Sequence, residues 1–230
     1  MKDLAIVLVS GGMDSCLTAT IAASKHKELA FLHLNYKQRT EARELKSFHE
    51  IADHFNVPQE RRKIIDISFL SQIGGSSLTD SNIDVKKYEG DSDEIPDSYV
   101  PFRNTHIISM GVSWAEVIGA TKIYIGAVEE DSSGYPDCRP SYYKAMNELI
   151  KQGTKEGVIE VITPIIEMTK QQIVKKSVEL NAPINLTWSC YDREDLSCGV
   201  CDSCALRLRG FQQAGIEDPI AYEQRPNYLK

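Results

Sequence analysis

The sequence predicts an α/β protein with a doubly wound, mostly parallel sheet and a small metal-binding region near its C-terminus. An uninterrupted apolar run at residues 4–9 leads directly into a glycine-rich turn and then into a helix-compatible stretch. Apolar runs and amphipathic stretches then alternate along most of the chain, which is the rhythm of βαβ units. Four cysteines also fall close together within residues 190–204.

The predicted strands and helices follow one another along the chain. Residues 4–9 are apolar throughout, as in a central parallel strand that is covered on both faces. Residues 40–55 place apolar side chains at helical spacing and are otherwise charged, which indicates an amphipathic helix. The other predicted strands are 29–34, 63–67, 122–127 and 159–162. The other predicted helices are 14–24, 104–118, 140–153, 170–180 and 205–214.

Residues 73–98 interrupt this rhythm with a Gly-Gly-Ser-Ser run followed by many Asp, Glu and Ser residues. We interpret the segment as a flexible surface loop. It either forms a lid that closes on a substrate or is a solvated insertion without a role, and the sequence favours neither.

Composition limits the kinds of partner. The 230 residues, 42% of them hydrophobic and 26% charged, suit one α/β domain with a small appendage. No apolar run approaches the length of a membrane span, and the chain enters its first predicted strand without room for a targeting peptide. We therefore expect a cytoplasmic protein with no membrane association. The net charge of −7 disfavours a nucleic-acid partner and favours small molecules.

The turn after the first predicted strand, Ser10-Gly11-Gly12-Met13-Asp14-Ser15, has the features of a phosphate cradle. Glycines let backbone N–H groups turn toward an anion, and a helix N-terminus adds partial positive charge. Ser10 and Ser15 offer hydroxyl donors, and Asp14 either holds Mg²⁺ or caps the helix. An ordinary strand-to-helix turn is the alternative. The expected nucleotide-binding residues are Leu8, Val9, Ser10, Gly11, Gly12, Met13, Asp14, Ser15, Cys16, Leu17 and Thr18.

This turn lacks the lysine and the glycine spacing of a Walker A loop. It resembles the SGGxDS loop of the ATP pyrophosphatases, or PP-loop group, which break ATP between the α and β phosphates and adenylate a substrate oxygen. The resemblance implies a nucleotide-binding α/β domain of the PP-loop ATPase type over residues 1–185. We expect residues 186–230 to form a helical, zinc-binding subregion that packs on it.

The cysteine cluster is the second strong signal. Cys190, Cys198, Cys201 and Cys204 are separated by seven, two and two residues, a set that suits a tetrahedral zinc site closed by sulfur. An iron–sulfur cluster is the main alternative, because short cysteine gaps serve such clusters too. A disulfide framework fits a chain of this length less well. Closed four-sulfur sites are usually structural, so we expect the metal to hold the C-terminal segment in place. Cys16 should pack in a helix as a small apolar residue.

Two helix starts carry candidate site residues. We predict that Asn104 is an N-cap and that Arg103 beside it faces the active site at the mouth of the sheet. Lys170 opens another predicted helix, where it either binds released pyrophosphate or is simply exposed.

The loop after the fourth predicted strand holds Tyr135, Asp137 and Arg139. These offer a flat stacking surface, an acceptor and a bidentate donor, which a purine-like base with a carboxylate requires. An ordinary Gly-Pro-Asp turn is the alternative.

Taken together, these motifs resemble the QueC family of queuosine biosynthesis, the 7-cyano-7-deazaguanine synthases, over almost the full chain. The resemblance rests on residues 10–15, 35–39, 100–104, 133–140, 189–191, 198–204, 206–207 and 210–211. It implies a ligase that converts 7-carboxy-7-deazaguanine, ammonia and ATP into the 7-cyano product, with AMP and pyrophosphate released.

The resemblance also implies bound Mg²⁺, one structural Zn²⁺ on the four cysteines, and a homodimer. The implied catalytic residues are Ser10, Asp14, Ser15, Arg103 and Lys170. The implied substrate-binding residues are Arg103, Asn104, Tyr135, Asp137 and Arg139. Two other functions compete with this one: a tRNA-thiolating PP-loop enzyme, and a zinc-stabilised module that binds ATP without turnover. The acidic charge and the closed set of four cysteines argue against the first, and an ATP–pyrophosphate exchange assay tests the second.

Overall fold

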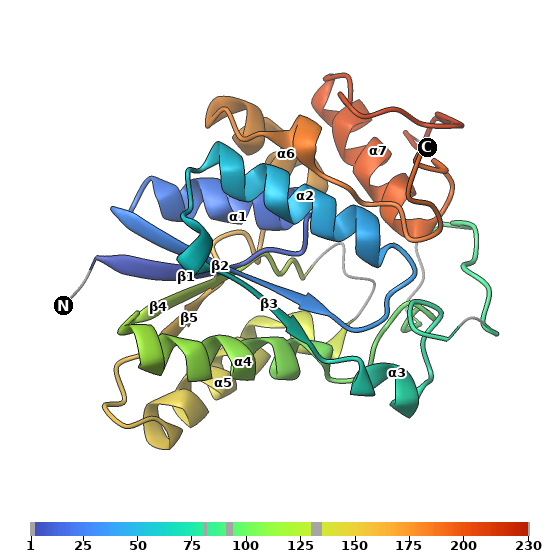
Figure 1. Cartoon of the computed structure of the whole chain (residues 1–230). Coiled ribbons are helices and arrows are strands. Elements are labelled where there is room, and N and C mark those ends of the chain that lie inside the picture. The colour runs from blue at the N-terminus through green and yellow to red at the C-terminus, as the bar shows by residue number, and fades with distance from the viewer. Residues whose placement is uncertain (1–2, 81, 91–93, 130–134, 230) are drawn as a thin grey trace.

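Five parallel strands form a single sheet in the order β3-β2-β1-β4-β5 (Figure 1). The computed structural model describes residues 3–80, 82–90, 94–129 and 135–229. The strands are β1 (Leu4–Leu8), β2 (Glu28–Asn35), β3 (Arg62–Asp66), β4 (Lys122–Ile125) and β5 (Glu160–Ile162).

The strand order reverses beside β1. The chain moves from β1 outward to β2 and β3, then crosses back to β4 and β5 on the other side. In register, Leu8 at the end of β1 pairs with Leu32 of β2 and Ile125 of β4. Open parallel sheets bind ligands at such a switch point, beyond the carboxyl ends of the strands.

Helices cover both faces of the sheet (Figure 1). On one face lie α1 (Met13–Ala23), α2 (Glu41–His54) and α6 (Lys170–Glu179), with α7 (Asp202–Ala214) packed against α6. On the other face lie α4 (Arg103–Ile118) and α5 (Pro140–Gly153). The remaining elements are α3 (Phe69–Ile73) and three short 3₁₀ turns, Gln59–Arg61, Pro136–Cys138 and Ile184–Leu186.

Alternating side chains of β1 supply the cores of both layers. Ile6 packs with the α4 and α5 side and Val7 with the α1 and α2 side, and both are fully buried. Each such burial stabilises the fold by about 1.5–3 kcal/mol. Gly111 lets α4 approach closely, because a Cβ there would lie 3.3 Å from the Leu8 side chain.

The predicted strands and helices are confirmed to within a few residues. The largest difference at a helix end is α7, which begins at Asp202 rather than Ala205, because Cys201 in extended backbone serves as its N-cap residue. The short helix α3 was not predicted. No helix in the described part of the chain is both long and apolar enough to cross a bilayer.

The segment 73–98 is better anchored than a free surface loop. Ser76 and Ser77 are buried, and Arg39 Nε donates to the Ser77 carbonyl over 2.7 Å. Further along, the Tyr88 N–H donates to the Val200 carbonyl over 2.8 Å, which ties the segment to the cysteine region. Much of it is therefore packed structure. Whether any part acts as a lid stays a prediction, and residues 81 and 91–93 lie outside the described residues.

Candidate active site and metal site

The turn after β1 forms an open cradle at the start of α1. Gly12 is the N-cap residue, and the Ser15 hydroxyl donates to its carbonyl over 2.9 Å. The Ser10 hydroxyl lies 3.2 Å from that of Ser15. Gly11 has φ +92°, and a Cβ there would lie 2.7 Å from the Glu44 carbonyl oxygen. The first N–H groups of α1 therefore face a compact turn that fits a phosphate.

A glycine at the end of β4 completes this cradle. A Cβ on Gly126 would lie 2.8 Å from the backbone of both Asp14 and Ser15. Only a glycine lets the end of β4 contact the first turn of α1 without displacing it. Gly126 carries no local signal in the sequence, because its constraint comes from a segment more than a hundred residues away.

Lys170 is part of this cradle and is not the freely exposed lysine that its position alone favours. Its Nζ lies 2.8 Å from Asp14 Oδ2, and its side chain is only 12% exposed. Thr169 caps α6 through a complete capping box with Gln172, which fixes the helix start. A Cβ on Gly210 of α7 would lie 2.7 Å from the Lys170 Cβ, so this glycine permits the close packing of α6 and α7.

The second carboxylate oxygen of Asp14 suits a divalent cation. Asp14 Oδ1 is buried and has no hydrogen-bond partner within the described residues. Buried polar atoms without a partner are rare, and carboxylate oxygens are ligands that Mg²⁺ prefers.

A cavity of about 280 Å³ opens across the carboxyl ends of β1, β2 and β4. The predicted site residues that line it are Leu8, Val9, Ser10, Gly12, Met13, Asp14, Ser15, Arg103, Asn104, Tyr135 and Lys170. The predicted residues outside its lining are Gly11, Cys16, Leu17, Thr18, Asp137 and Arg139. Cys16, Leu17 and Thr18 are fully buried within α1.

Arg103 reaches the cavity from the first residue of α4. Its Nη1 donates to the Tyr36 hydroxyl over 3.0 Å. Burial acts to lower the pKa of Arg103, but Tyr36, Tyr135, Tyr191 and Asp137 together raise it above its ordinary value. A charged guanidinium at this end of the cavity is therefore available to an anionic substrate.

The prediction that Asn104 is the N-cap of this helix is wrong. Phe102 is the N-cap residue, in left-handed backbone with φ +59°, and Asn104 lies inside the first turn. The Asn104 N–H donates to Asp137 Oδ2 over 3.0 Å, and its side-chain amide donates to the Asp137 carbonyl over 2.9 Å. A distant carboxylate therefore takes the capping role, because the tertiary fold brings it to the unpaired N–H groups.

Tyr135 and Arg139 end up in different surroundings. The Tyr135 hydroxyl lies 2.8 Å from Ser98 Oγ, and the residue lines the cavity. Arg139 is exposed at the start of α5 and does not reach the cavity lining. Ser133 and Gly134 of the same predicted motif lie outside the described residues.

One wall of the cavity comes from the C-terminal part of the chain. Trp188, Ser189, Tyr191 and Arg207 all line it. The Trp188 N–H donates to the Gly11 carbonyl over 2.9 Å and so ties this wall to the cradle. None of these residues was predicted to have a role of its own. The motif around Cys190 belongs to the family resemblance, but no local pattern links it to the phosphate turn.

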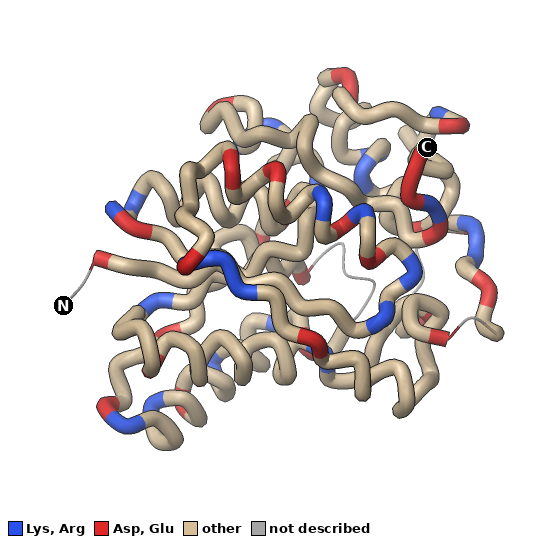
Figure 2. Tube along the Cα trace, viewed as in Figure 1, with Lys and Arg blue, Asp and Glu red and all other residues tan. Residues whose placement is uncertain are grey.

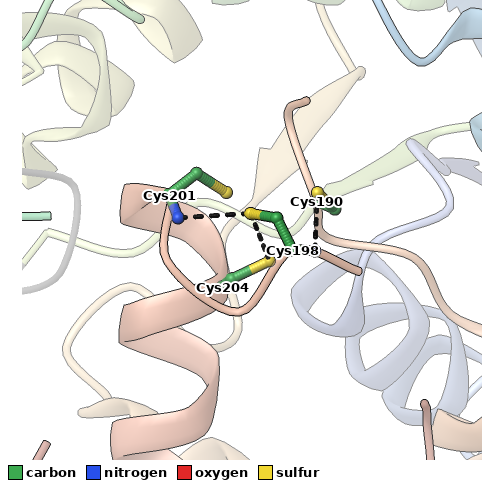
Figure 3. Close-up of side chains that lie close together, drawn as sticks. All are labelled: Cys190, Cys198, Cys201 and Cys204. Atoms are coloured by element: carbon green, nitrogen blue, oxygen red, sulfur yellow. Dashed lines mark hydrogen bonds between the residues drawn. The ribbon is translucent and has the colours of Figure 1, made fainter. Parts of the chain in front are cut away.

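The four cysteines form a closed sulfur site (Figure 3). Their Sγ atoms all lie within 4.8 Å of one another, and all four residues are buried. The N–H groups of Val200 and Cys201 point at Cys198 Sγ over 3.4 and 3.3 Å. The neighbouring thiols, Cys190 first, and the Val200 N–H lower the pKa of Cys198. Four buried sulfurs with backbone donors fit a tetrahedral metal ion.

The fold and the site together define a nucleotide-binding protein of the PP-loop ATPase class. The order β3-β2-β1-β4-β5, the SGGMDS turn after β1 and the cavity at the switch point carry this assignment. A crystal structure of a 4-thiouridine synthetase–RNA complex with bound ATP has a similar fold, with a TM-score of 0.50 and 16% identity. The alignment covers 80% of this chain and 42% of that one.

A family model described as queuosine biosynthesis protein QueC matches residues 4–215, and the chain belongs to this family. A 7-cyano-7-deazaguanine synthase of Chlorobium chlorochromatii is 58% identical over 226 residues, which cover 98% of each chain. One of Chlorobaculum parvum is 55% identical over 227 residues, covering 98% of this chain and 99% of the relative. The chain is thus an enzyme of queuosine biosynthesis.

Proposed function

We propose that the chain is an ATP-dependent ligase that converts 7-carboxy-7-deazaguanine and ammonia into 7-cyano-7-deazaguanine, with release of AMP and pyrophosphate. The observation that carries the proposal is one cavity lined by two chemically different sets of residues. Ser10, Asp14 and Lys170 belong to the phosphate cradle, and Arg103 and Tyr135 line the same cavity. An acid and a nucleotide held in one cavity have the proximity that adenylation requires.

The cradle end suits the triphosphate of ATP. The N–H groups at the start of α1 and the hydroxyls of Ser10 and Ser15 bind phosphate oxygens, and Lys170 meets the charge of departing pyrophosphate. Asp14, through its unpartnered oxygen, would hold a Mg²⁺ ion that neutralises phosphate charge. Lys170 then exchanges its Asp14 partner for phosphate oxygens.

The Arg103 end suits the acid. A guanidinium pairs with a carboxylate through two parallel hydrogen bonds and orients one oxygen toward the α-phosphorus. Tyr135 and Asn104 line the same cavity and would contact the base. Contacts of the base with Asp137 and Arg139 stay predictions, because Asp137 already caps α4 and Arg139 is exposed.

Two adenylations at the same place complete the reaction. The first activates the carboxylate, and ammonia then displaces AMP and leaves an amide. The second activates the amide oxygen, and loss of AMP leaves the nitrile. Both need a substrate oxygen in line with the α-phosphorus, so one rigid cradle serves both.

The cysteine site has a structural role in this proposal. Cys190, Cys198, Cys201 and Cys204 would hold Zn²⁺, which supplies a fixed tetrahedral link between the segment after α6 and the start of α7. Cys190 lies next to Ser189 and Tyr191, which line the cavity, so the metal holds a wall of the active site.

We assign the reaction to the cytoplasm and to a homodimer that uses small molecules. All six cysteines are unbridged, which suits a reducing compartment. Lys and Arg are interspersed with Asp and Glu over the trace in view (Figure 2), in keeping with a substrate smaller than a nucleic acid. Sedimentation equilibrium tests the dimer.

Mass spectrometry of a reaction with ATP, ammonium and 7-carboxy-7-deazaguanine tests the proposal, with a matched reaction without ammonium as its control. We expect the nitrile, AMP and pyrophosphate, and no nitrile in the control. AMP formation with some other acid would keep the adenylating chemistry and overturn the substrate. ATP binding without any pyrophosphate exchange would indicate a non-catalytic module instead.

A further inference from the structure

Glu44 is a cavity carboxylate that the chemistry above leaves without a role. It lies in the first turn of α2 and lines the cavity together with Arg103 and Tyr36. Its backbone carbonyl is packed against Gly11 of the phosphate cradle, where a Cβ would come within 2.7 Å. The position of Glu44 is therefore set relative to the bound phosphates.

Two neutral donors hold the Glu44 carboxylate. Thr40 Oγ1 donates to its Oε1 over 2.9 Å, and Gln38 Nε2 donates to its Oε2 over 3.1 Å. Gln38 is itself fixed, because its Oε1 accepts from the Tyr36 N–H over 2.9 Å. Thr40 and Gln38 are both buried. Each oxygen keeps a lone pair for a further partner, and the side chain has little freedom to turn away.

The surroundings of Glu44 make its carboxylate able to accept a proton near neutral pH. Burial raises the pKa of its carboxyl to about 7, against the hydrogen bonds from Thr40 and Gln38 and the charge of Arg103, while Glu41 raises it further. The other ionisable group facing it is the Tyr36 phenol, whose pKa burial raises to about 12. No ion pair holds Glu44 within the residues described.

The other acidic and basic groups of the cavity are less suited to accept a proton. Asp14 is paired with Lys170 at the phosphate end. His33 is 1% exposed, its Nδ1 is bound to the Val9 carbonyl, and burial lowers its pKa. Burial also raises the pKa of Tyr135 and of Tyr191.

We propose that Glu44 is the general base that takes a proton from the substrate nitrogen during amide and nitrile formation. The inference rests on the proposed function, because that reaction releases protons from nitrogen beside the activated carbon. As ammonia attacks, the N–C bond forms, the bond from carbon to the AMP oxygen breaks with its electron pair leaving on AMP, and an N–H proton passes to Glu44. When the amide oxygen then bonds to the α-phosphorus and pyrophosphate leaves, one N–H proton of the amide departs to solvent and an imidate with a single N–H remains. In the last step the remaining N–H bond pair becomes the third C–N bond, AMP leaves again, and that proton passes to Glu44. Solvent takes the proton between the two steps.

The substitution Glu44→Gln separates this role from adenylation. We expect acid-dependent ATP–pyrophosphate exchange to continue at a rate close to that of the unmodified enzyme. Nitrile formation should fall by about 10²–10⁴-fold. Hydroxylamine, a nucleophile that is neutral at pH 7, should still trap the activated acid as a hydroxamate. Glu44→Asp should restore part of the rate.

The pH profile gives a second readout. At a constant concentration of free ammonia, kcat of the unmodified enzyme should rise with pH through about 7, as the Glu44 carboxyl becomes ionised. This rise of kcat with pH should disappear in Glu44→Gln. The matched control is Glu50→Gln, which removes a carboxylate from the same helix, outside the cavity lining, and is not among the groups that shift the Glu44 pKa. The control should keep both the rate and the profile.

Three results would overturn the inference. One is nitrile formation by Glu44→Gln at an unchanged rate, and another is a rise of kcat with pH that survives the substitution. The third is loss of pyrophosphate exchange in parallel with nitrile formation, which would mean that Glu44 supports adenylation or folding. If the unmodified enzyme activates the acid yet makes neither amide nor nitrile, the proposed function itself fails, and Glu44 loses this role with it.

Discussion

Two regions line the cavity: the edge of the sheet where the strands have their carboxyl ends, and the C-terminal segment 186–229. The two regions are held in place in different ways. The edge presents residues that follow directly from strands, such as Ser10 after β1 and Gly126 after β4. The segment has no strand in that sheet. It is tied to the rest of the chain by the packing of α7 on α6 and by backbone hydrogen bonds, from Trp188 to the Gly11 carbonyl and from Tyr88 to the Val200 carbonyl, and its four cysteines gather at one point. Regular structure thus positions the phosphate turn, whereas helix packing, backbone hydrogen bonds and the cysteine cluster position the C-terminal wall.

The largest expected effect concerns the edge. Asp14→Asn should lower turnover by about 10²–10⁴-fold, because it removes both a cation ligand and the partner of Lys170. Folding and metal content should stay unchanged, as measured by circular dichroism and elemental analysis. Asp53→Asn, at an exposed carboxylate on α2, is the control and should behave like the unmodified protein. Undiminished turnover in Asp14→Asn would refute its role.

The next effect concerns the C-terminal segment. Cys201→Ser, or removal of the metal by a chelator, should lower the free energy of unfolding by about 4 kcal/mol or more. ATP binding should weaken at the same time, because Ser189 and Tyr191 lose their anchor at Cys190. Thermal unfolding, titration calorimetry and metal analysis measure the three quantities. A Cys201→Ser variant with unchanged stability and metal content would show that the C-terminal segment does not depend on the four-cysteine site.

A third prediction concerns a buried ion pair, which stabilises the same segment independently of the cysteine site. Asp218 pairs with Arg207 over 2.7 Å, and both side chains are almost fully buried. Asp218→Asn should cost about 3–5 kcal/mol, because a buried guanidinium loses its counter-charge. Asp195→Asn, at an exposed position nearby in the chain, is the matched control. Equal unfolding midpoints in urea for the two variants would mean that the ion pair contributes little.

The smallest effect tests the contact between β4 and α1. Gly126→Ala should cost about 1–3 kcal/mol and weaken ATP binding, because its Cβ would collide with the backbone of Asp14 and Ser15. Gly153→Ala at the end of α5 meets no atom within 4 Å and should be neutral. If the two variants have equal unfolding midpoints and equal affinity for ATP, the close approach at Gly126 is not needed.

Sequence reasoning reached the features that short stretches of chain encode. Each strand of the parallel sheet, the turn at Ser10 to Ser15 and the cysteine set are encoded in short stretches of chain, and their patterns follow from backbone geometry and metal chemistry. It missed Asp137 as the cap of α4, because a cap supplied from a separate loop leaves no local signature. The ion pair between Lys170 and Asp14 could not be predicted either, since the two residues are 156 positions apart in the sequence.

The sequence alone therefore determined the fold class, the glycine-rich turn after β1, the four-cysteine cluster and the family. The tertiary structure decided which side chains share the cavity. It brought Glu44 and Trp188 to the cradle, left Arg139 at the surface, and made a glycine necessary at residue 126. The physical reason is that periodicity and turn chemistry act over a few neighbouring residues. Burial, pKa and ion pairing depend instead on every segment that packs around a group, wherever it lies in the chain.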